Sequence, residues 1–340
     1  MYETFYGLTG KPFQLNPDPA FLFSSKGHSS AYAYLKYGVF QGEGFIVVTG
    51  EIGAGKTTLI RALLEELDPA RVIAAQLVST MLDSDNLLRA VATAFGLAVR
   101  GEDKAHLLAG LEAFLTSLVT QNKRALLVVD EAQNLTPQAM EELRMLSNFQ
   151  LGDRALLQSF LVGQPELRNL MRAPTMQQLR QRIIASYHLG PMDKSETRAY
   201  VEHRLHRVGW NGDPQFEPEV FAEIYDASGG IPRRINQLCN RLLLAGFLAE
   251  KHQLTAADAE EVIKELSTEL SADAPRAPVV VLPGAHRPAG EPVSGDFASL
   301  AATVDRMDSN INVILDLLQS IVRPARTDKP GAKSGGSSAA

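Results

Sequence analysis

A glycine-rich loop between an apolar run and a helix constrains the fold of this 340-residue chain more than any other feature. Residues 45–49, Phe-Ile-Val-Val-Thr, are almost wholly apolar, which is typical of a strand buried on both faces of a parallel sheet. The segment that follows matches the P-loop pattern and consists of Gly50, Glu51, Ile52, Gly53, Ala54, Gly55, Lys56, Thr57 and Thr58. A helix is predicted over residues 55–67. The order strand, glycine loop, helix predicts an α/β fold with a parallel sheet.

The residue types of this P-loop fit a phosphate ligand. Glycines allow backbone N–H groups to turn inward around a phosphate, and the start of a helix adds a favourable dipole. Lys56 is placed to reach the β- and γ-phosphates, and the Thr57 hydroxyl is a ligand for Mg²⁺. The P-loop therefore predicts a site for ATP and Mg²⁺.

Two acids follow a second apolar run at residues 126–129. An acid at the carboxyl end of a buried parallel strand lies in the crevice where ligands bind in such sheets. We expect Asp130 to hold Mg²⁺ and Glu131 to polarise an attacking water, which favours hydrolysis over transfer to a small acceptor. The alternative is that both acids simply begin a solvated loop before Pro137.

Further short apolar runs alternate with helical patterns up to residue 191. Strands are predicted at residues 45–49, 72–77, 125–129, 157–162 and about 186–189, and helices at 28–40, 55–67, 86–95, 104–120, 137–149 and 175–183. After Pro191 only helices are predicted, near 194–208, 218–227, 232–250 and 256–270. The alternation indicates a doubly wound α/β core followed by a separate helical domain.

Three further residues could couple the phosphate site to its surroundings. Gln164 follows the fourth strand and could orient the water or sense the γ-phosphate. Arg182, with Arg180 as the second choice, could reach the ATP of a neighbouring subunit and stabilise transition-state charge. Arg233 stands in the first turn of a helix, where a cation opposes the helix dipole, so a phosphate contact is the natural explanation. The alternatives are an ordinary polar strand end for Gln164 and solvated or internally paired arginines.

Together these residues resemble an AAA+ ATPase, and other segments resemble the ExeA/GspA-type secretion ATPases, nearest to the subfamily associated with exosortase (PEP-CTERM) loci. The resemblance covers about residues 1–268 and is carried by segments 5–8, 11–13, 16–19, 42–45, 130–135, 143–149, 163–167 and 179–183. It implies an AAA+ core with a five-stranded parallel sheet at 1–191 and a helical lid at 192–270, with residues 13–23 bordering the adenine. It also implies that Gln164 and Arg233 are the first and second sensors.

The resemblance implies an ATP-hydrolysing protein that assembles or energises an envelope secretion, protein-sorting or exopolysaccharide export system. The expected partners are other copies of the chain, with a hexamer as one form, and a protein of the inner-membrane export machinery. The chain departs from the ExeA/GspA type after residue 268, where neither a membrane span nor a peptidoglycan-binding domain is visible. The alternatives are a nucleotide-gated scaffold with slow turnover and a DNA-targeting ATPase of the transposition type.

The last 70 residues differ in composition from the rest. Five prolines between residues 271 and 295 predict a linker, and the Gly/Ser/Ala/Lys-rich stretch 323–340 predicts a disordered tail. Between them, at 296–322, eight apolar residues at alternating spacings of three and four predict a coiled-coil-like helix. Self-association or a partner helix is the favoured role, ahead of packing on the chain's own domains and of membrane contact.

Composition argues against several further classes of protein. A net charge of −6 argues against a broad nucleic-acid interface, and one cysteine, Cys239, excludes a disulfide framework. No signal peptide and no apolar run long enough to span a bilayer are visible, so a cytoplasmic location is expected, peripheral to the inner membrane through a partner. The seven histidines show no metal-ligand spacing and receive no predicted role.

Overall fold

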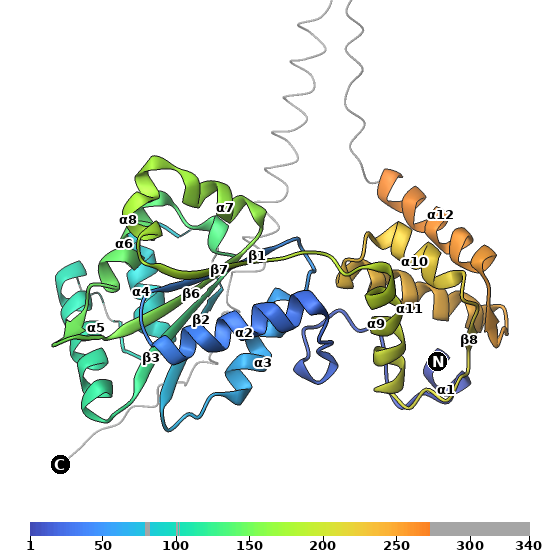
Figure 1. Cartoon of the computed structure of the whole chain (residues 1–340), viewed down its shortest axis with the longest axis horizontal. Helices are drawn as coiled ribbons and strands as arrows, with labels where there is room; N and C mark the ends of the chain where they lie inside the picture. The colour runs from blue at the N-terminus through green and yellow to red at the C-terminus, as the bar shows by residue number, and fades with distance from the viewer. Residues whose placement is uncertain (79–81, 100, 102, 273–340) are drawn as a thin grey trace, which may run out of the picture. The chain divides into compact units, whose positions relative to one another are not determined.

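The computed structural model describes residues 1–78, 82–99, 101 and 103–272 (Figure 1). Apart from residues 271 and 272, the predicted linker, coiled-coil-like helix and tail lie outside the described residues. No helix within the described ranges is long and apolar enough to cross a membrane.

A five-stranded parallel sheet forms the first part of the chain, in the order β2-β3-β6-β1-β7. Its strands are β1 (Phe45–Gly50), β2 (Val72–Val78), β3 (Arg124–Asp130), β6 (Leu157–Gly163) and β7 (Ile183–Leu189). The predicted α/β fold with its five strands is thereby confirmed. Thr49 lies opposite Gly163, and Val129 lies opposite Leu161, so β1, β3 and β6 end at the same edge of the sheet.

Helices cover both faces of this sheet, which explains the continuously apolar strands. Val47 and Val129 face one layer of helices, whereas Val48 and Val128 face the other. The first layer includes α4 (Ser84–Ala94), α5 (Lys104–Thr120), α6 (Pro137–Leu146) and α7 (Pro165–Arg172), and the second includes α2 (Lys26–Gln41) and α3 (Lys56–Glu66). Figure 1 shows these helices on the two sides of the strands.

Some predicted elements differ from the structure. The helix predicted over residues 175–183 is wrong in extent: it consists of η3 (Pro174–Met176) and α8 (Gln177–Arg180). Ile183 belongs to β7, where it pairs with Phe45, because its β-branched side chain suits a strand. Helix α7 was not predicted. Two short strands, β4 (Gln150–Leu151) and β5 (Arg154–Ala155), form an antiparallel hairpin.

The helical part contains α9 (Lys194–His206), α10 (Val220–Ser228), α11 (Pro232–Leu248) and α12 (Ala256–Ala272). The expectation of no strand after Pro191 is wrong, because β8 (Gln215–Phe216) pairs in parallel with β9 (Gln253–Leu254). Strands of two residues are too short to show a periodic pattern in the sequence.

The N-terminal residues pack with this helical part. Tyr2, of α1 (Tyr2–Phe5), and Tyr6, Leu8 and Phe13 share one buried cluster with residues of α9, α10 and α11. The chain then crosses to α2 through residues 14–25, which include η1 (Pro19–Phe21). Residues 14–23, here called the strap, thus connect the helical core to the α/β part, whereas the sequence placed the whole N-terminal segment with the α/β core.

Candidate nucleotide-binding site

The P-loop leads from the end of β1 to the start of α3 in a conformation that requires two glycines. Gly53 has φ +82° and Gly55 has φ +97°, which are left-handed values that favour glycine. A Cβ atom at Gly53 would lie 2.2 Å from Cβ of Arg233, and one at Gly55 would lie 2.7 Å from Nε2 of His28. The side chains of Arg233 and His28 therefore leave no space for a side chain at Gly53 or Gly55.

Lys56 is buried at the first position of α3. Its Nζ donates hydrogen bonds to the carbonyls of Gly50 (2.8 Å) and Glu51 (3.0 Å). Burial lowers the pKa of Lys56, although the nearby carboxylates of Glu131 and Asp130 oppose that shift. The ammonium group is therefore held by neutral acceptors that phosphate oxygens could replace.

Thr57 and Asp130 form the second element of the site. The Thr57 hydroxyl donates a hydrogen bond of 2.9 Å to Oδ2 of Asp130, and Oδ1 of Asp130 accepts the N–H of Glu131 at 3.0 Å. Asp130 is buried at the end of β3. A hydroxyl and a carboxylate are oxygen ligands of the kind that Mg²⁺ takes beside phosphates, so these two residues fit a Mg²⁺ site.

Glu131 occupies an unusual backbone conformation, with φ +52°. Its Oε2 accepts hydrogen bonds from two side-chain amides, Nε2 of Gln133 at 2.6 Å and Nε2 of Gln164 at 2.9 Å. Burial acts to raise the pKa of Glu131, but these two hydrogen bonds and the charge of Lys56 outweigh it, so the pKa lies below its usual value. The carboxylate is therefore ionised near neutral pH.

A pocket opens above the P-loop between the α/β part and the helical part. Lys56, Thr57 and Glu131 line it together with Arg233. The strap forms another wall, through residues that include Gln14, Asp18, Phe21 and Phe23, and α9 and α11 contribute Tyr200, Arg204 and Asn236. That residues 13–23 border the base of a nucleotide stays a prediction; the strap lines this pocket, whereas Phe13 does not.

Two arginines hold the strap in place. Arg204, buried on α9, donates from Nη2 to the carbonyl of Gln14 at 3.3 Å and from Nε to the carbonyl of Pro12, just before the strap, at 2.6 Å. Its guanidinium also lies over the Phe21 ring. On the other side, Nη1 of Arg61 on α3 donates to the carbonyl of Pro17 at 2.8 Å. The strap is thus fastened to both parts of the chain that form the pocket.

The structure places the three predicted coupling residues differently. Gln164 occupies the N-cap position of α7 beside Glu131, without a capping hydrogen bond from its side chain. Arg233 lies against the P-loop, and its backbone N–H donates to the carbonyl of Gly53 at 3.1 Å. Arg182 is not among the residues that line the pocket. Its Nη1 donates to the carbonyl and the hydroxyl of Ser147 (3.0 Å each), and its Nη2 donates to Asn148. Arg180 similarly binds the carbonyls of Met171 and Ala173.

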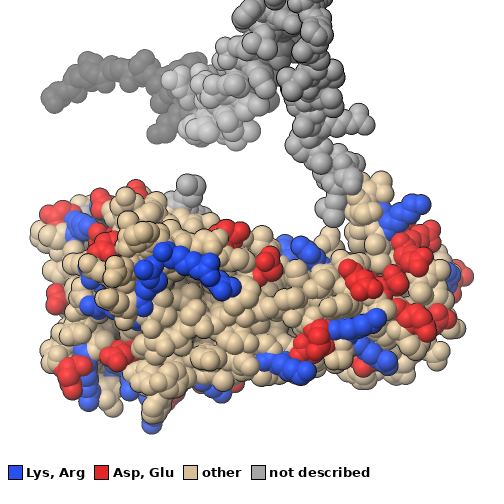
Figure 2. All heavy atoms as spheres, turned by 45° about the horizontal axis from the view of Figure 1, so that its top comes forward, with Lys and Arg blue, Asp and Glu red and all other residues tan. Residues whose placement is uncertain are grey.

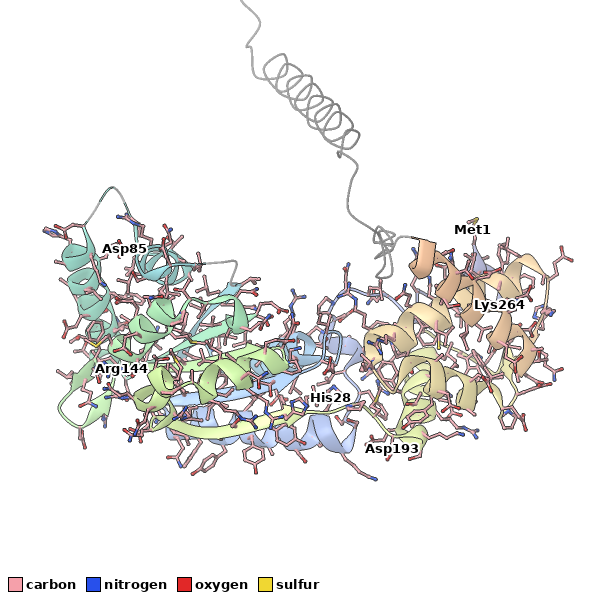
Figure 3. The ribbon with its side chains drawn as sticks, turned by 90° about the horizontal axis from the view of Figure 1, so that it is seen from above. Met1, His28, Asp85, Arg144, Asp193 and Lys264 are labelled. Atoms are coloured by element: carbon pink, nitrogen blue, oxygen red, sulfur yellow. The ribbon has the colours of Figure 1, made fainter. Side chains whose placement is uncertain are left out.

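Two residues at the site were missed by the sequence analysis. His28, labelled in Figure 3, is buried on α2 and its Nε2 lies 3.0 Å from the carbonyl of Ala54 in the P-loop. Gln133 holds Glu131, as described above. His28 stands in a helical pattern like any polar helix residue, so no sequence signal marks it. Gln133 stands two residues after Glu131, within segment 130–135 that carries the family resemblance, but that segment gave it no role of its own.

Comparisons with known proteins find similarity in the part of the chain that carries the P-loop. Residues 39–171 match the family model described as an AAA domain. General secretion pathway protein A of Aeromonas hydrophila is 39% identical over 268 residues, which cover 78% of this chain and 49% of that protein. The chain therefore spans about half the length of this curated relative.

Solved structures share the fold at low sequence identity. The ADP form of the ORC2 protein of Aeropyrum pernix has a TM-score of 0.58 and 18% identity, covering 75% of this chain and 72% of that chain. The CDC6P protein of Pyrobaculum aerophilum has a TM-score of 0.55 and 17% identity, covering 80% and 74%. These likenesses concern the fold: with the match of residues 39–171 to the AAA domain, they show an α/β AAA+ fold, and in sequence the chain is similar to general secretion pathway protein A.

Proposed function

We propose that the chain binds ATP with Mg²⁺ in the pocket above the P-loop and hydrolyses it to ADP and phosphate. The convergence of Lys56, Thr57, Asp130, Glu131 and Gln164 at one edge of the sheet supports this function most directly. These residues arise from separate segments of the chain, and each is of the type that one step of the reaction needs.

In the proposed binding step, Lys56 exchanges its two carbonyl acceptors for the β- and γ-phosphate oxygens. Thr57 and Asp130 would hold Mg²⁺, which would supply positive charge beside the phosphates. Arg233 lies against Gly53 of the P-loop, lines the same pocket as Lys56 and offers a cation from the helical part.

In the proposed hydrolytic step, the oxygen of a water attacks the γ-phosphorus and the bond to ADP breaks. Glu131 accepts the water's proton, and its lowered pKa keeps it in the ionised form that a base requires. Gln164 donates to Glu131 and stands at the start of α7, so it can transmit the state of the γ-phosphate to that helix.

For the cellular role, we propose that ATP turnover assembles or energises an envelope secretion system. The 39% identity to general secretion pathway protein A supports this class. The motifs that resemble the exosortase-associated subfamily favour protein sorting or exopolysaccharide export as the process. We further propose an oligomer of the chain, at the cytoplasmic side, that works with a protein of the inner-membrane machinery.

A DNA-targeting role receives no comparable support. The ORC and CDC6 structures are under 20% identical, so their likeness concerns the fold alone. On the face drawn in Figure 2, basic and acidic side chains of the described residues are interspersed, with wide uncharged areas between them.

Glu131→Gln and Lys56→Ala test the activity. We expect Glu131→Gln to bind Mg-ATP like the wild type but to hydrolyse it at least about tenfold more slowly, because a neutral amide cannot act as a base. Lys56→Ala should lose most nucleotide affinity. Binding is measured by titration with a fluorescent ATP analogue and turnover by phosphate release; equal turnover of wild type and Glu131→Gln would remove Glu131 from this role.

A second experiment tests the cellular role. ATP-loaded Glu131→Gln is used to capture a partner, and the ATP turnover of the wild type is then measured with and without that partner. Stimulated turnover supports a machine driven by ATP hydrolysis, whereas low and unchanged turnover supports a nucleotide-gated scaffold.

A further inference from the structure

The side-chain amide of Gln133 connects two residues of the candidate site that come from different strands. Its Nε2 donates to Oε2 of Glu131 at 2.6 Å, and its Oε1 accepts the backbone N–H of Gln164 at 3.0 Å. Glu131 follows β3, whereas Gln164 follows β6. Gln133 therefore bridges the ends of two neighbouring strands.

The orientation of this amide is determined by its partners. A backbone N–H can only donate, so the Gln133 atom facing Gln164 must be the carbonyl oxygen. An ionised carboxylate can only accept, so the atom facing Glu131 must be the amide nitrogen. The Gln133 carbonyl also packs closely against β6, since a Cβ atom at Gly163 would lie 2.6 Å from it.

Glu131 needs such support because its own backbone does not place it by default. It has a left-handed φ of +52° and lies between β3 and η2 (Ala132–Asn134). Gln133 and Gln164 both donate to Oε2, which leaves Oε1 as the oxygen to accept a proton from water. Gln133 is not among the residues that line the pocket, so it acts on Glu131 rather than on the ligand.

We infer that Gln133 is a positioning residue, which holds the Glu131 carboxylate toward the pocket and ties its position to the first turn of α7. The inference rests on the proposed ATPase function. A displacement of about 1 Å at a reacting group can lower a rate by about 10²-fold. Loss of Gln133 should therefore affect the chemical step and leave nucleotide binding nearly unchanged.

Two substitutions separate the two bonds of Gln133. Gln133→Met keeps the length of the side chain but removes both the donor and the acceptor. Gln133→Glu keeps oxygens that could accept the N–H of Gln164, but it replaces the donor to Glu131 with a second carboxylate, which repels the Glu131 carboxylate. Gln138→Met makes the same chemical change at an exposed position on α6 and serves as the matched control.

We expect kcat to fall roughly 10- to 100-fold in Gln133→Met and Gln133→Glu, with the affinity for ATP within about twofold of the wild type. Hydrogen exchange of the nucleotide-free protein gives an independent readout: the backbone amide of Gln164 should exchange faster in Gln133→Met, which offers it no acceptor. Gln138→Met should match the wild type in all three measurements.

Specific outcomes would overturn the inference. A normal kcat in Gln133→Met, in a protein where Glu131→Gln is inactive, would refute the role of Gln133 and leave the proposed function intact. Unchanged exchange at Gln164 in Gln133→Met would refute the link to α7. A wild-type protein without ATPase activity would refute the proposed function and, with it, the catalytic role of Gln133.

Discussion

The backbone N–H of Arg233, in the first turn of α11, donates a hydrogen bond of 3.1 Å to the carbonyl of Gly53 in the P-loop. The Cβ of Arg233 lies so close to Gly53 that no side chain fits between them. The helical part and the P-loop therefore contact each other through their backbones, so a change in the conformation of one alters the position of the other.

Gly53→Ala tests this contact. The new methyl group would lie 2.2 Å from Cβ of Arg233, so α11 must shift or the P-loop must change its conformation. Overpacking of this kind costs about 1–3 kcal/mol, in addition to the strain of alanine at positive φ. We expect a lower melting temperature and weaker nucleotide binding, measured by thermal unfolding and by titration.

Gly96→Ala is the control for this substitution. Gly96 has a similar φ of +80°, but a Cβ atom there would have no atom within 4 Å. It should therefore show the backbone strain alone and bind nucleotide normally. Equal losses of affinity in the two variants would contradict a specific role for the Gly53–Arg233 contact.

Arg233→Ala removes the side chain of Arg233 but keeps its backbone hydrogen bond to Gly53. Hydrogen bonds to charged groups are worth about 1.5–3 kcal/mol, so we expect ATP to bind at least about tenfold more weakly, with a smaller effect on ADP. The neighbouring Arg234 lines a separate hollow with residues of α10 and α12, so Arg234→Ala is the matched control. Equal effects of the two substitutions on ATP binding would speak against a phosphate contact by Arg233.

The elements that carry the site could largely be predicted from the sequence. Strands β1 and β3 are buried on both faces, so their apolar runs are continuous and end at the P-loop and at Asp130. Parallel strands end at one edge of the sheet, and only β6 lies between β1 and β3, so Thr57 at the start of α3 reaches Asp130 as the motifs predict.

Contacts that depend on tertiary packing could not be predicted in this way. Tyr2 and Tyr6 lie more than 180 residues before the helices whose core they join. No local sequence pattern predicts a contact between segments so far apart. Helix α7 has only eight residues and begins at Pro165, which leaves little room for a periodic pattern. The role of Gln133 depends on the positive φ of Glu131, a backbone feature that side-chain patterns do not report.

His28 predicts a dependence of stability on pH. Its Nε2 faces the carbonyl of Ala54, which can only accept, so the proton lies on Nε2 and Nδ1 accepts from the Ser25 hydroxyl at 2.7 Å. Burial lowers the pKa of His28, because the charged form is poorly solvated. Below the unfolded-state pKa of about 6.5 the unfolded chain takes up a proton that the folded chain does not, so the folded state loses stability as pH falls.

Urea unfolding at pH 7.5 and 5.5 measures this effect. His203 also has a pKa lowered by burial, so the wild type carries at least two such contributions. His28→Asn cannot titrate at this position and should lose less stability than the wild type between the two pH values. Identical losses in both proteins would mean that His28 takes up its proton equally well in the folded state.

The environment of Arg182 decides how this residue could act on the ATP of a neighbouring subunit. It directly precedes β7, and Ile183 pairs with Phe45 at the start of β1, whereas the P-loop follows the end of β1. Its guanidinium binds Ser147 and Asn148 within the same chain. Arg182 therefore cannot serve the pocket of its own chain from this position, and a catalytic role requires a second copy.

Arg182→Ala should then bind ATP almost normally but hydrolyse it roughly 10³-fold more slowly, at the low end of the range for arginine fingers. Mixing Arg182→Ala with Lys56→Ala is the sharper test, because each is inactive alone. A mixed oligomer contains interfaces with an intact P-loop on one side and an intact Arg182 on the other, so turnover should partly recover. If the two proteins co-assemble without recovery, and Arg182→Ala also melts at a lower temperature, the hydrogen bonds to Ser147 and Asn148 are the function of Arg182, and Arg180 is the next residue to test in trans.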